Sequence, residues 1–157
     1  MSRRRQAEKR PLIEDAKFHS TLVSRLVNTV MNSGKKSTAQ RIVYGAFDQL
    51  AEKNPQSSPL EILQRAVDNA KPRLEVKARR VGGATYQVPM EVPPARQLAL
   101  AMRWIVGYAQ ARKNVPLVKA LASELKEAAI EQGNAIKKRD DTHKMAQANR
   151  AFAHFRF

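Results

Sequence analysis

The residues of this sequence whose types could do chemistry are mostly basic. The stretch Gly34-Lys35-Lys36-Ser37 looks like a phosphate-binding loop, but that motif needs a glycine where Thr29 stands and a serine or threonine where Lys36 stands. The two lysines instead precede a predicted helix, whose first backbone N–H groups favour a phosphate. We therefore expect Lys35 and Lys36 to contact an anion, without a nucleotide site.

The inventory for catalysis or metal binding is poor. The three histidines, His19, His143 and His154, are scattered along the chain and have no carboxylates at metal-ligand spacing. Asp140 and Asp141 are adjacent, so they point to different sides of a helix. There is no cysteine, which excludes thiolate metal sites and disulfides. The sequence predicts no enzyme activity, no metal site and no cofactor.

A basic β-hairpin is the most distinctive chemical feature. Apolar and charged residues alternate from Leu74 to Arg79 and again from Tyr86 to Val92, with Gly82-Gly83 between the two runs. This pattern predicts a hairpin arm over residues 73–92. Its cations are Lys71, Arg73, Lys77, Arg79 and Arg80, against one acid, Glu75. A protruding basic ribbon with a glycine turn is typical of nucleic-acid contact.

Further basic segments flank this arm. The start of the chain carries Arg3, Arg4, Arg5, Lys9 and Arg10. No acid occurs from Val92 to Ser123, a stretch that carries Arg96, Arg103, Arg112, Lys113 and Lys119. The run Lys137-Lys138-Arg139 falls near a predicted helix N-terminus, which is the unfavourable end for cations and so favours an external anion.

The overall charge favours a polyanionic partner. The 157 residues include 29 Lys and Arg against 14 Asp and Glu, which gives a net charge of +15. Such an excess opposes compaction, and phosphate backbones are the commonest partner that relieves it. No apolar run approaches the ~20 residues that span a bilayer, and the charge is spread over several segments, so we expect no membrane partner.

The elements that must position these cations are mainly helical. Periodicity and capping signals predict a mainly α fold: six helices in one domain spanning 1–157, with the hairpin arm protruding between the third and fourth helices. We expect a basic N-terminal arm over 1–18 and a C-terminal tail over 149–157. Predicted helix starts are Ser20, Ser37, Ser58, Pro94, Pro116 and Asn134. Trp104 is expected to belong to the core, and the fourth and sixth helices are expected to carry apolar residues that include Ala99, Met145 and Ala148.

The tail has two equally good interpretations. Phe152, Phe155 and Phe157 alternate with Arg150 and Arg156, a composition that suits stacking on RNA bases. The same residues could instead fold back on the core.

The motifs together resemble a known family, the bacterial and organellar small-subunit ribosomal protein seven family. The resemblance rests on Met31 to Ser37 with Ile42 to Ala46, on Arg79-Arg80-Val81-Gly82-Gly83 with the residues up to Pro89, on Arg103-Trp104, and on Ala148 to Arg156. It covers about nine-tenths of the chain. The resemblance implies a fold of six helices with a ribbon arm. It also implies that the protein binds the 3′ major domain of small-subunit ribosomal RNA and starts assembly of the head. The arm is then expected to lie near the exit-site tRNA and the mRNA path.

Carried over by position, the resemblance gives two sets of residues. The expected rRNA-binding set is Arg3, Arg4, Arg5, Lys9, Arg10, Lys35, Lys36, Lys71, Arg73, Lys77, Arg79, Arg80, Arg96, Arg103, Arg112 and Lys113. The set expected near tRNA or mRNA is Arg79, Arg80, Gly82, Gly83, Tyr86, Lys137, Lys138, Arg139, Lys144 and Arg150. Neighbouring proteins of the head and platform are the other expected partners.

Two alternatives stay open from the residues alone. A DNA-binding regulator or architectural protein would also use basic helices and a ribbon. An enzyme that acts on RNA is the weaker alternative, because the catalytic inventory is poor. The expected location is a bacterial cytoplasmic ribosome, with a plastid ribosome as the other possibility.

Overall fold

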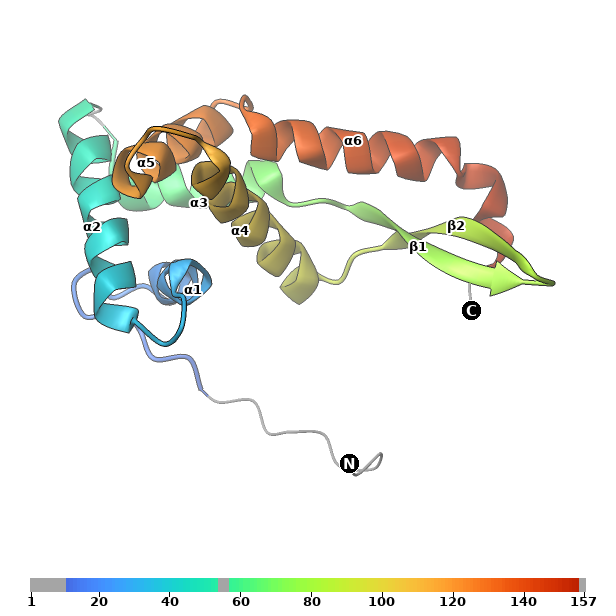
Figure 1. Cartoon of the computed structure of the whole chain (residues 1–157), viewed down its shortest axis with the longest axis horizontal. Coiled ribbons are helices and arrows are strands. Elements are labelled where there is room, and N and C mark those ends of the chain that lie inside the picture. The colour runs from blue at the N-terminus through green and yellow to red at the C-terminus, as the bar shows by residue number, and fades with distance from the viewer. Residues whose placement is uncertain (1–10, 54–56, 156–157) are drawn as a thin grey trace.

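The chain folds into a helical body from which one long arm extends (Figure 1). The computed structural model describes residues 11–53 and 57–155. The elements run in the order α1 (Thr21–Val30), α2 (Lys36–Lys53), α3 (Pro59–Ala70), β1 (Leu74–Val81), β2 (Ala84–Glu91), α4 (Pro94–Ala111), α5 (Leu117–Ala129), α6 (Asn134–Ala148) and the 3₁₀-helix η1 (Arg150–Phe155). The predicted mainly α fold, with a hairpin between the third and fourth helices, is confirmed.

Local sequence signals account for most helix starts. Ser58 is the N-cap of α3, and its side-chain oxygen accepts a hydrogen bond from the backbone N–H of Leu60 at 3.4 Å. Pro59 occupies the first turn, where its missing N–H costs nothing. Ser20 is the N-cap residue of α1 but makes no side-chain capping bond. Helix α2 begins at Lys36, so Ser37 lies inside its first turn and the predicted cap at Ser37 is wrong.

Helix α5 lies at the centre of the body. It packs against α2, α3 and α4, and its Leu121 and Leu125 are fully buried. Gly45 of α2 allows this close packing, because a Cβ at that position would lie 3.2 Å from Val118 Cγ1 on α5. Burial of such apolar side chains supplies the main driving force for folding the body.

Three apolar residues of α4 and α6 lie at the surface. Met145 is 45% exposed, and Ala99 and Ala148 are also exposed. Helix α6 starts against the body but continues out alongside the arm, so its C-terminal half has fewer neighbours to pack against (Figure 1). Trp104 is half-buried and packs against the edge of the core. The prediction that Trp104 belongs to the core is therefore confirmed only in part.

The arm is a two-stranded antiparallel ribbon. Its register runs from Leu74 opposite Glu91 to Val81 opposite Ala84. The turn residues Gly82 and Gly83 have φ values of +57° and +89°, which glycine adopts without strain and which match the twist of a tight hairpin. An isolated pair of strands is marginally stable in water. The ribbon is supported along its length by α6 and η1 (Figure 1).

The segment before α1 divides into two parts. Of the N-terminal arm predicted over 1–18, residues 1–10 lie outside the described residues. Residues 15–18 belong to the body. Asp15 is buried and accepts hydrogen bonds from the backbone N–H of Lys17 and Phe18 and from Tyr44 Oη. The Phe18 ring meets the Phe47 ring edge-on at 5.1 Å.

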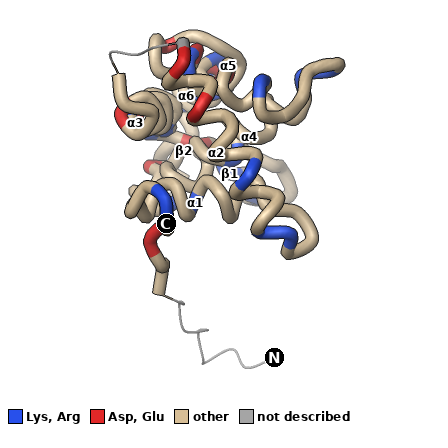
Figure 2. Tube along the Cα trace, turned by 90° about the vertical axis from the view of Figure 1, so that its left-hand side faces the viewer, with Lys and Arg blue, Asp and Glu red and all other residues tan. Residues whose placement is uncertain are grey.

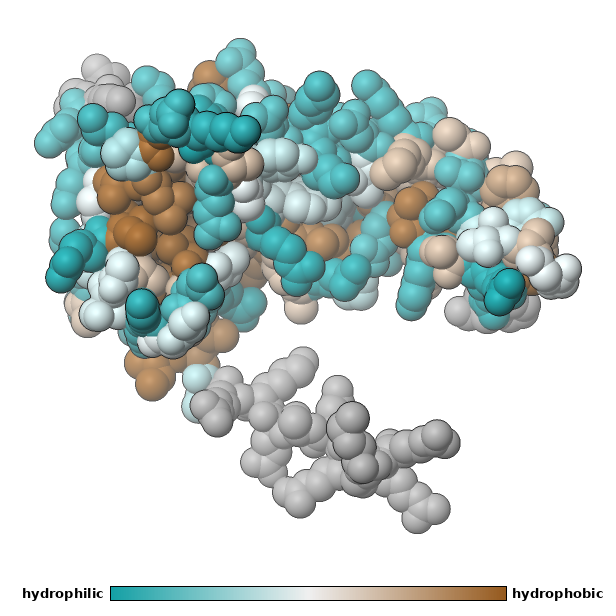
Figure 3. Space-filling view, viewed as in Figure 1, coloured by the Kyte–Doolittle hydropathy of each residue, from teal (hydrophilic) through white to brown (hydrophobic). Residues whose placement is uncertain are grey.

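The surface is largely hydrophilic along α6 and the front of the body (Figure 3). An apolar area lies over the end of the body where α2 and α5 meet (Figure 3). Among the helices that the structure describes, none is both long enough and apolar enough to cross a membrane.

Candidate nucleic-acid interface

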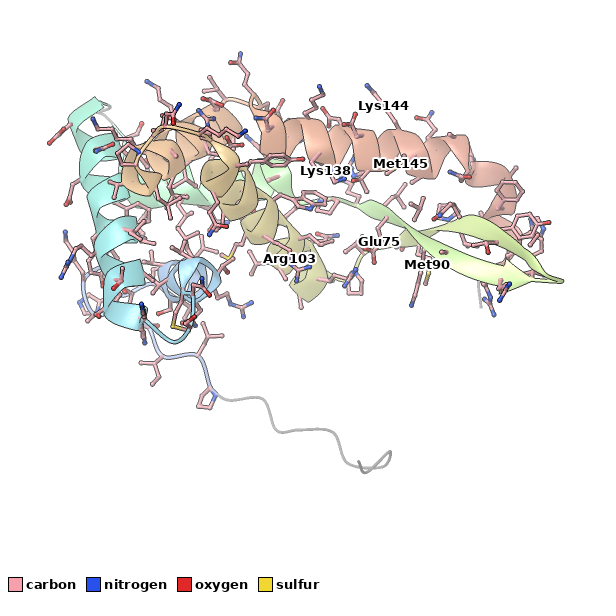
Figure 4. The ribbon with its side chains drawn as sticks, viewed as in Figure 1. Glu75, Met90, Arg103, Lys138, Lys144 and Met145 are labelled. Carbon is pink, nitrogen blue, oxygen red and sulfur yellow. The ribbon has the colours of Figure 1, made fainter. Side chains whose placement is uncertain are left out.

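Many of the predicted contact residues present their charge freely. Within residues 11–53 and 57–155, no ion pair or side-chain hydrogen bond to a described residue engages the following cations: Lys35, Lys36, Arg73, Lys77, Arg80, Arg103, Lys113, Lys137, Lys138, Lys144 and Arg150. All except the half-buried Lys138 are exposed. Figure 4 places Arg103 on α4 and Lys138 and Lys144 on α6, so these cations come from different elements.

Lysines and arginines are unevenly distributed around the body. Viewed from the end opposite the arm, basic segments are more frequent on the right-hand side, where α4 lies (Figure 2). Acidic segments are more frequent toward the left and centre, around α3 (Figure 2). An asymmetric charge of this kind raises the local concentration of a polyanion on one side of the protein.

The outer half of the arm carries cations without acids. From Val76 to Met90 the chain contains Lys77, Arg79 and Arg80 and no Asp or Glu. All three side chains are exposed, and so are the turn residues Gly82 and Gly83. The arm therefore presents three positive charges and a bare backbone turn away from the body.

The base of the arm is fixed by polar contacts to two helices. Arg96 at the start of α4 forms a bidentate pair with Glu75 of β1, with Nε–Oε1 at 2.7 Å and Nη2–Oε2 at 2.9 Å. This bond to the carboxylate raises the pKa of Arg96 above its ordinary value. On α6, His143 Nε2 accepts a hydrogen bond from the backbone N–H of Arg73 at 2.9 Å. Arg96 thus orients the arm and is a weaker candidate for an RNA contact.

The His143 ring must be neutral, with Nε2 unprotonated, to accept the hydrogen bond from Arg73 N–H. Burial, followed by the positive charge of Arg139, lowers the pKa of His143, while Asp140 raises it and Arg73 lowers it further. The neutral form is therefore favoured, and His143 has a structural role at the junction of arm and body. In the sequence His143 is a single histidine on a predicted helix, and no local pattern predicts its hydrogen bond to a residue 70 positions away.

A pocket of about 480 Å³ lies between the arm, α6 and η1. Its wall is mostly apolar with a basic rim, and its lining residues are Arg73, Leu74, Pro89, His143, Ala146, Gln147, Arg150 and Ala153. The paired strands at its side carry Glu75 and Met90, which Figure 4 places at the base of the arm.

Arg112 belongs to an internal ion cluster. Its Nη2 lies 2.6 Å from Glu124 Oε2 and 2.6 Å from Glu127 Oε2. Glu124 is fully buried, and its Oε1 accepts a hydrogen bond from the backbone N–H of Ala135 at the start of α6. The cluster ties the end of α4 to α5 and α6, so Arg112 is occupied within the protein. The i, i+3 spacing of Glu124 and Glu127 places both on one helix face, a signal that could have revealed the pair.

Two more cations of the predicted sets have partners. Arg139 Nη1 donates to the backbone carbonyl of Asn69 at 2.6 Å, and its guanidinium also pairs with Asp140. Lys71 Nζ lies 2.6 Å from Asp68 Oδ1. Arg139 therefore fastens α6 to the end of α3, while Lys71 pairs with a residue one turn earlier.

The tail does not fold back on the core of the helical body. Residues Arg150–Phe155 form η1, which packs against β2 of the arm and not against the core. The Tyr86 ring lies 5.1 Å from Phe152 and 5.2 Å from Phe155, centroid to centroid. Phe157, like Arg3, Arg4, Arg5, Lys9 and Arg10, lies outside the described residues.

Comparison with known proteins identifies the family. The family model described as ribosomal protein S7p/S5e matches residues 2–150. Proteins named small ribosomal subunit protein uS7 are similar over the full length of both chains, at 59% identity in Akkermansia muciniphila, 54% in Anaeromyxobacter dehalogenans and 55% in Marinobacter nauticus. The expected family and the expectation that the chain is not an enzyme are both confirmed. The chain belongs to the S7p/S5e family of ribosomal proteins, a structural family and not an enzymatic one.

Proposed function

We propose that this chain is a primary ribosomal RNA-binding protein of the small subunit, which binds the 3′ major domain and nucleates assembly of the head. As a member of the S7p/S5e family it is a structural constituent of the small ribosomal subunit. The finer statements, which name the RNA domain and the step in assembly, rest on the family resemblance together with the placement of the cations.

The outer half of the arm is the observation that carries the proposal. It projects from the body, it carries Lys77, Arg79 and Arg80 with no acid, and it ends in a glycine turn that lets the backbone approach a ligand closely. Free cations on α4, in the loop after α4 and at the start of α2 extend the positive surface, chiefly Arg103, Lys113, Lys35 and Lys36. Such a surface suits a folded RNA, whose phosphates approach from several directions.

The arm and α6 are also proposed to lie near the exit-site tRNA and the mRNA path. The residues concerned are the tip glycines Gly82 and Gly83 and the exposed cations Lys137, Lys144 and Arg150. The tip of the arm and the C-terminal half of α6 extend beyond the body (Figure 1), whereas Lys137 lies in the first turn of α6 next to the body. Proteins of the head and platform are the proposed neighbours in the subunit.

The proposed location is the cytoplasm of a bacterium. The relatives at 54–59% identity named above come from bacteria. A plastid ribosome is the alternative that the sequence left open.

The proposal is tested by binding the purified protein to the 3′ major domain RNA across a salt series, with duplex DNA of equal length as competitor. We expect tight, RNA-selective binding whose affinity falls steeply with salt, because each phosphate contact releases counterions. Replacing Lys77 and Arg80 together by Gln should weaken binding and flatten the salt dependence. Arg65→Gln is the matched control, because Arg65 is exposed on α3 and belongs to neither predicted set.

Two outcomes would overturn the proposal. A complex insensitive to salt would exclude a surface built on many phosphate contacts. Equal affinity for RNA and duplex DNA would leave only charge-driven association and would favour the DNA-binding alternative.

A further inference from the structure

The two adjacent arginines of the arm, Arg79 and Arg80, have the same charge but different surroundings. Successive side chains of a strand point to opposite faces, and residues paired across two strands share a face. Arg79 is opposite Tyr86, and Arg80 is opposite Thr85. Arg79 and Tyr86 therefore share one face of the ribbon, and Arg80 and Thr85 share the other.

The face that carries Arg79 and Tyr86 is covered by the tail. Tyr86 packs against Phe152 and Phe155 of η1, whose rings lie 6.5 Å apart with an interplanar angle of 16°. Arg79 Nη1 donates a hydrogen bond to the backbone carbonyl of Phe155 at 2.9 Å. Phe155 ends η1, and the last carbonyls of a helix have no partner within the helix. A guanidinium at that end satisfies a carbonyl and complements the helix dipole.

The opposite face is open over the outer half of the arm. Ala78, Arg80, Thr85 and Gln87 are all exposed, and Ala78 is opposite Gln87 in the register. Within the described residues, the Arg80 guanidinium makes no ion pair or hydrogen bond. Small and polar side chains around one free arginine allow a phosphate backbone to come close to the ribbon.

We propose that Arg79 is a positioning residue and that Arg80 is the RNA contact of the pair. Together with Tyr86, Phe152 and Phe155, Arg79 attaches the tail to the arm and fixes the direction of the arm. The division rests on the function proposed above. It differs from the expectation, given by the family resemblance, that both arginines contact RNA. We call the contacts of Arg79 and Tyr86 with Phe152 and Phe155 the clasp. The clasp holds the arm against α6 and η1, so that the open face of the arm meets the RNA in one orientation.

Fixing the arm has a physical reason. A ribbon of two strands is marginally stable alone, and a flexible arm would lose conformational entropy on binding. Holding the arm in its bound direction before RNA arrives reduces that cost and so raises affinity. Loss of the clasp should therefore weaken binding by the same factor at every salt concentration, because no phosphate contact is lost.

The test compares identical substitutions at the two neighbours. Arg80→Gln should lower the slope of log affinity against log salt by about 0.7 to 0.9, the contribution of one phosphate contact. Arg79→Gln removes the same charge but keeps a side-chain donor for the Phe155 carbonyl, so the slope should not change. Arg65→Gln on α3 is the control for a charge lost from the exposed surface elsewhere.

Two clasp variants supply the second readout. Arg79→Ala and Phe152→Ala should leave the salt slope unchanged, weaken binding several-fold at all salt concentrations, and speed amide hydrogen exchange in η1 and the outer strands of the free protein. Arg80→Ala should leave that exchange unchanged. Circular dichroism of each variant checks that the helical body is folded.

Three results bear on the proposal. If Arg79→Gln flattens the salt slope as much as Arg80→Gln, Arg79 is itself a phosphate contact and the division is wrong. If neither substitution changes the slope, the assignment of Arg80 is overturned. Failure of the proposed function looks different, since the parent protein would then bind duplex DNA as well as RNA, or bind without salt dependence, before any variant is compared.

Discussion

Replacing Arg112 by Ala is expected to destabilise the body without affecting RNA recognition. Arg112 lies 2.6 Å from a carboxylate oxygen of both Glu124 and Glu127, and Glu124 is fully buried. Removing one partner of a buried pair leaves an uncompensated charge and costs about 3 to 5 kcal/mol. Arg112 is 27% exposed, which lowers that cost through solvent screening to about 2 to 4 kcal/mol of unfolding free energy.

The assay is urea unfolding followed by circular dichroism, supported by thermal unfolding. For a chain of this size, about 3 kcal/mol corresponds to a fall in Tm of about 6 to 12 °C. Glu124→Gln combined with Arg112→Met should recover much of the stability, since it removes the buried Glu124 charge together with Arg112, keeps an acceptor for the Ala135 N–H, and leaves only the partly exposed Glu127 without a partner.

The reasoning would be refuted by a cost below about 1 kcal/mol at pH 7, the range of an exposed ion pair. In the RNA-binding assay, Arg112→Ala should keep the parent salt slope at a temperature where it is folded. A flatter slope would return Arg112 to the RNA-contact set.

Three further predictions follow from the same geometry. The pKa of His143 lies below the ordinary value of 6.5 in the folded protein, so His143 binds a proton more readily in the unfolded chain. The stability that neutral His143 contributes is therefore present above pH 6.5 and is lost as the pH falls through the folded-state pKa. His143→Gln, which keeps an acceptor for the Arg73 N–H, should flatten the unfolding free energy between pH 7 and pH 5, and an unchanged profile would contradict this. Gly133 has φ +90°, and a Cβ there would lie 3.0 Å from Glu127 Oε2, so Gly133→Ala should cost about 1 to 3 kcal/mol in urea unfolding; a stabilised variant would show that the loop adjusts freely. Trp104, the single tryptophan of the chain, is half-buried beside the free cation of Arg103. RNA binding should therefore change its fluorescence, and an unchanged spectrum at saturation would exclude this face of α4 from the interface.

Local patterns were enough to predict the elements. The start of α3 follows from Ser58 and Pro59, because capping depends on residues within one turn. The hairpin follows from two alternating runs around Gly82-Gly83, whose positive φ values only a few residue types adopt readily. The predicted cap at Ser37 was wrong, and local patterns did not show that Ala99, Met145 and Ala148 are exposed. The boundary and the burial of a helix depend on what packs against it.

Composition, periodicity and turn residues were enough to predict a basic, mainly helical protein with a glycine-tipped arm, and the motifs were enough to identify the family. Which cations are free depends on the tertiary fold. Arg112, Arg139 and Arg96 pair with groups 12, 70 and 21 residues away, and Arg79 reaches a carbonyl 76 residues away. Charge and spacing along the chain are local quantities, whereas the availability of a cation depends on which distant carboxylates and carbonyls the fold brings within hydrogen-bond distance.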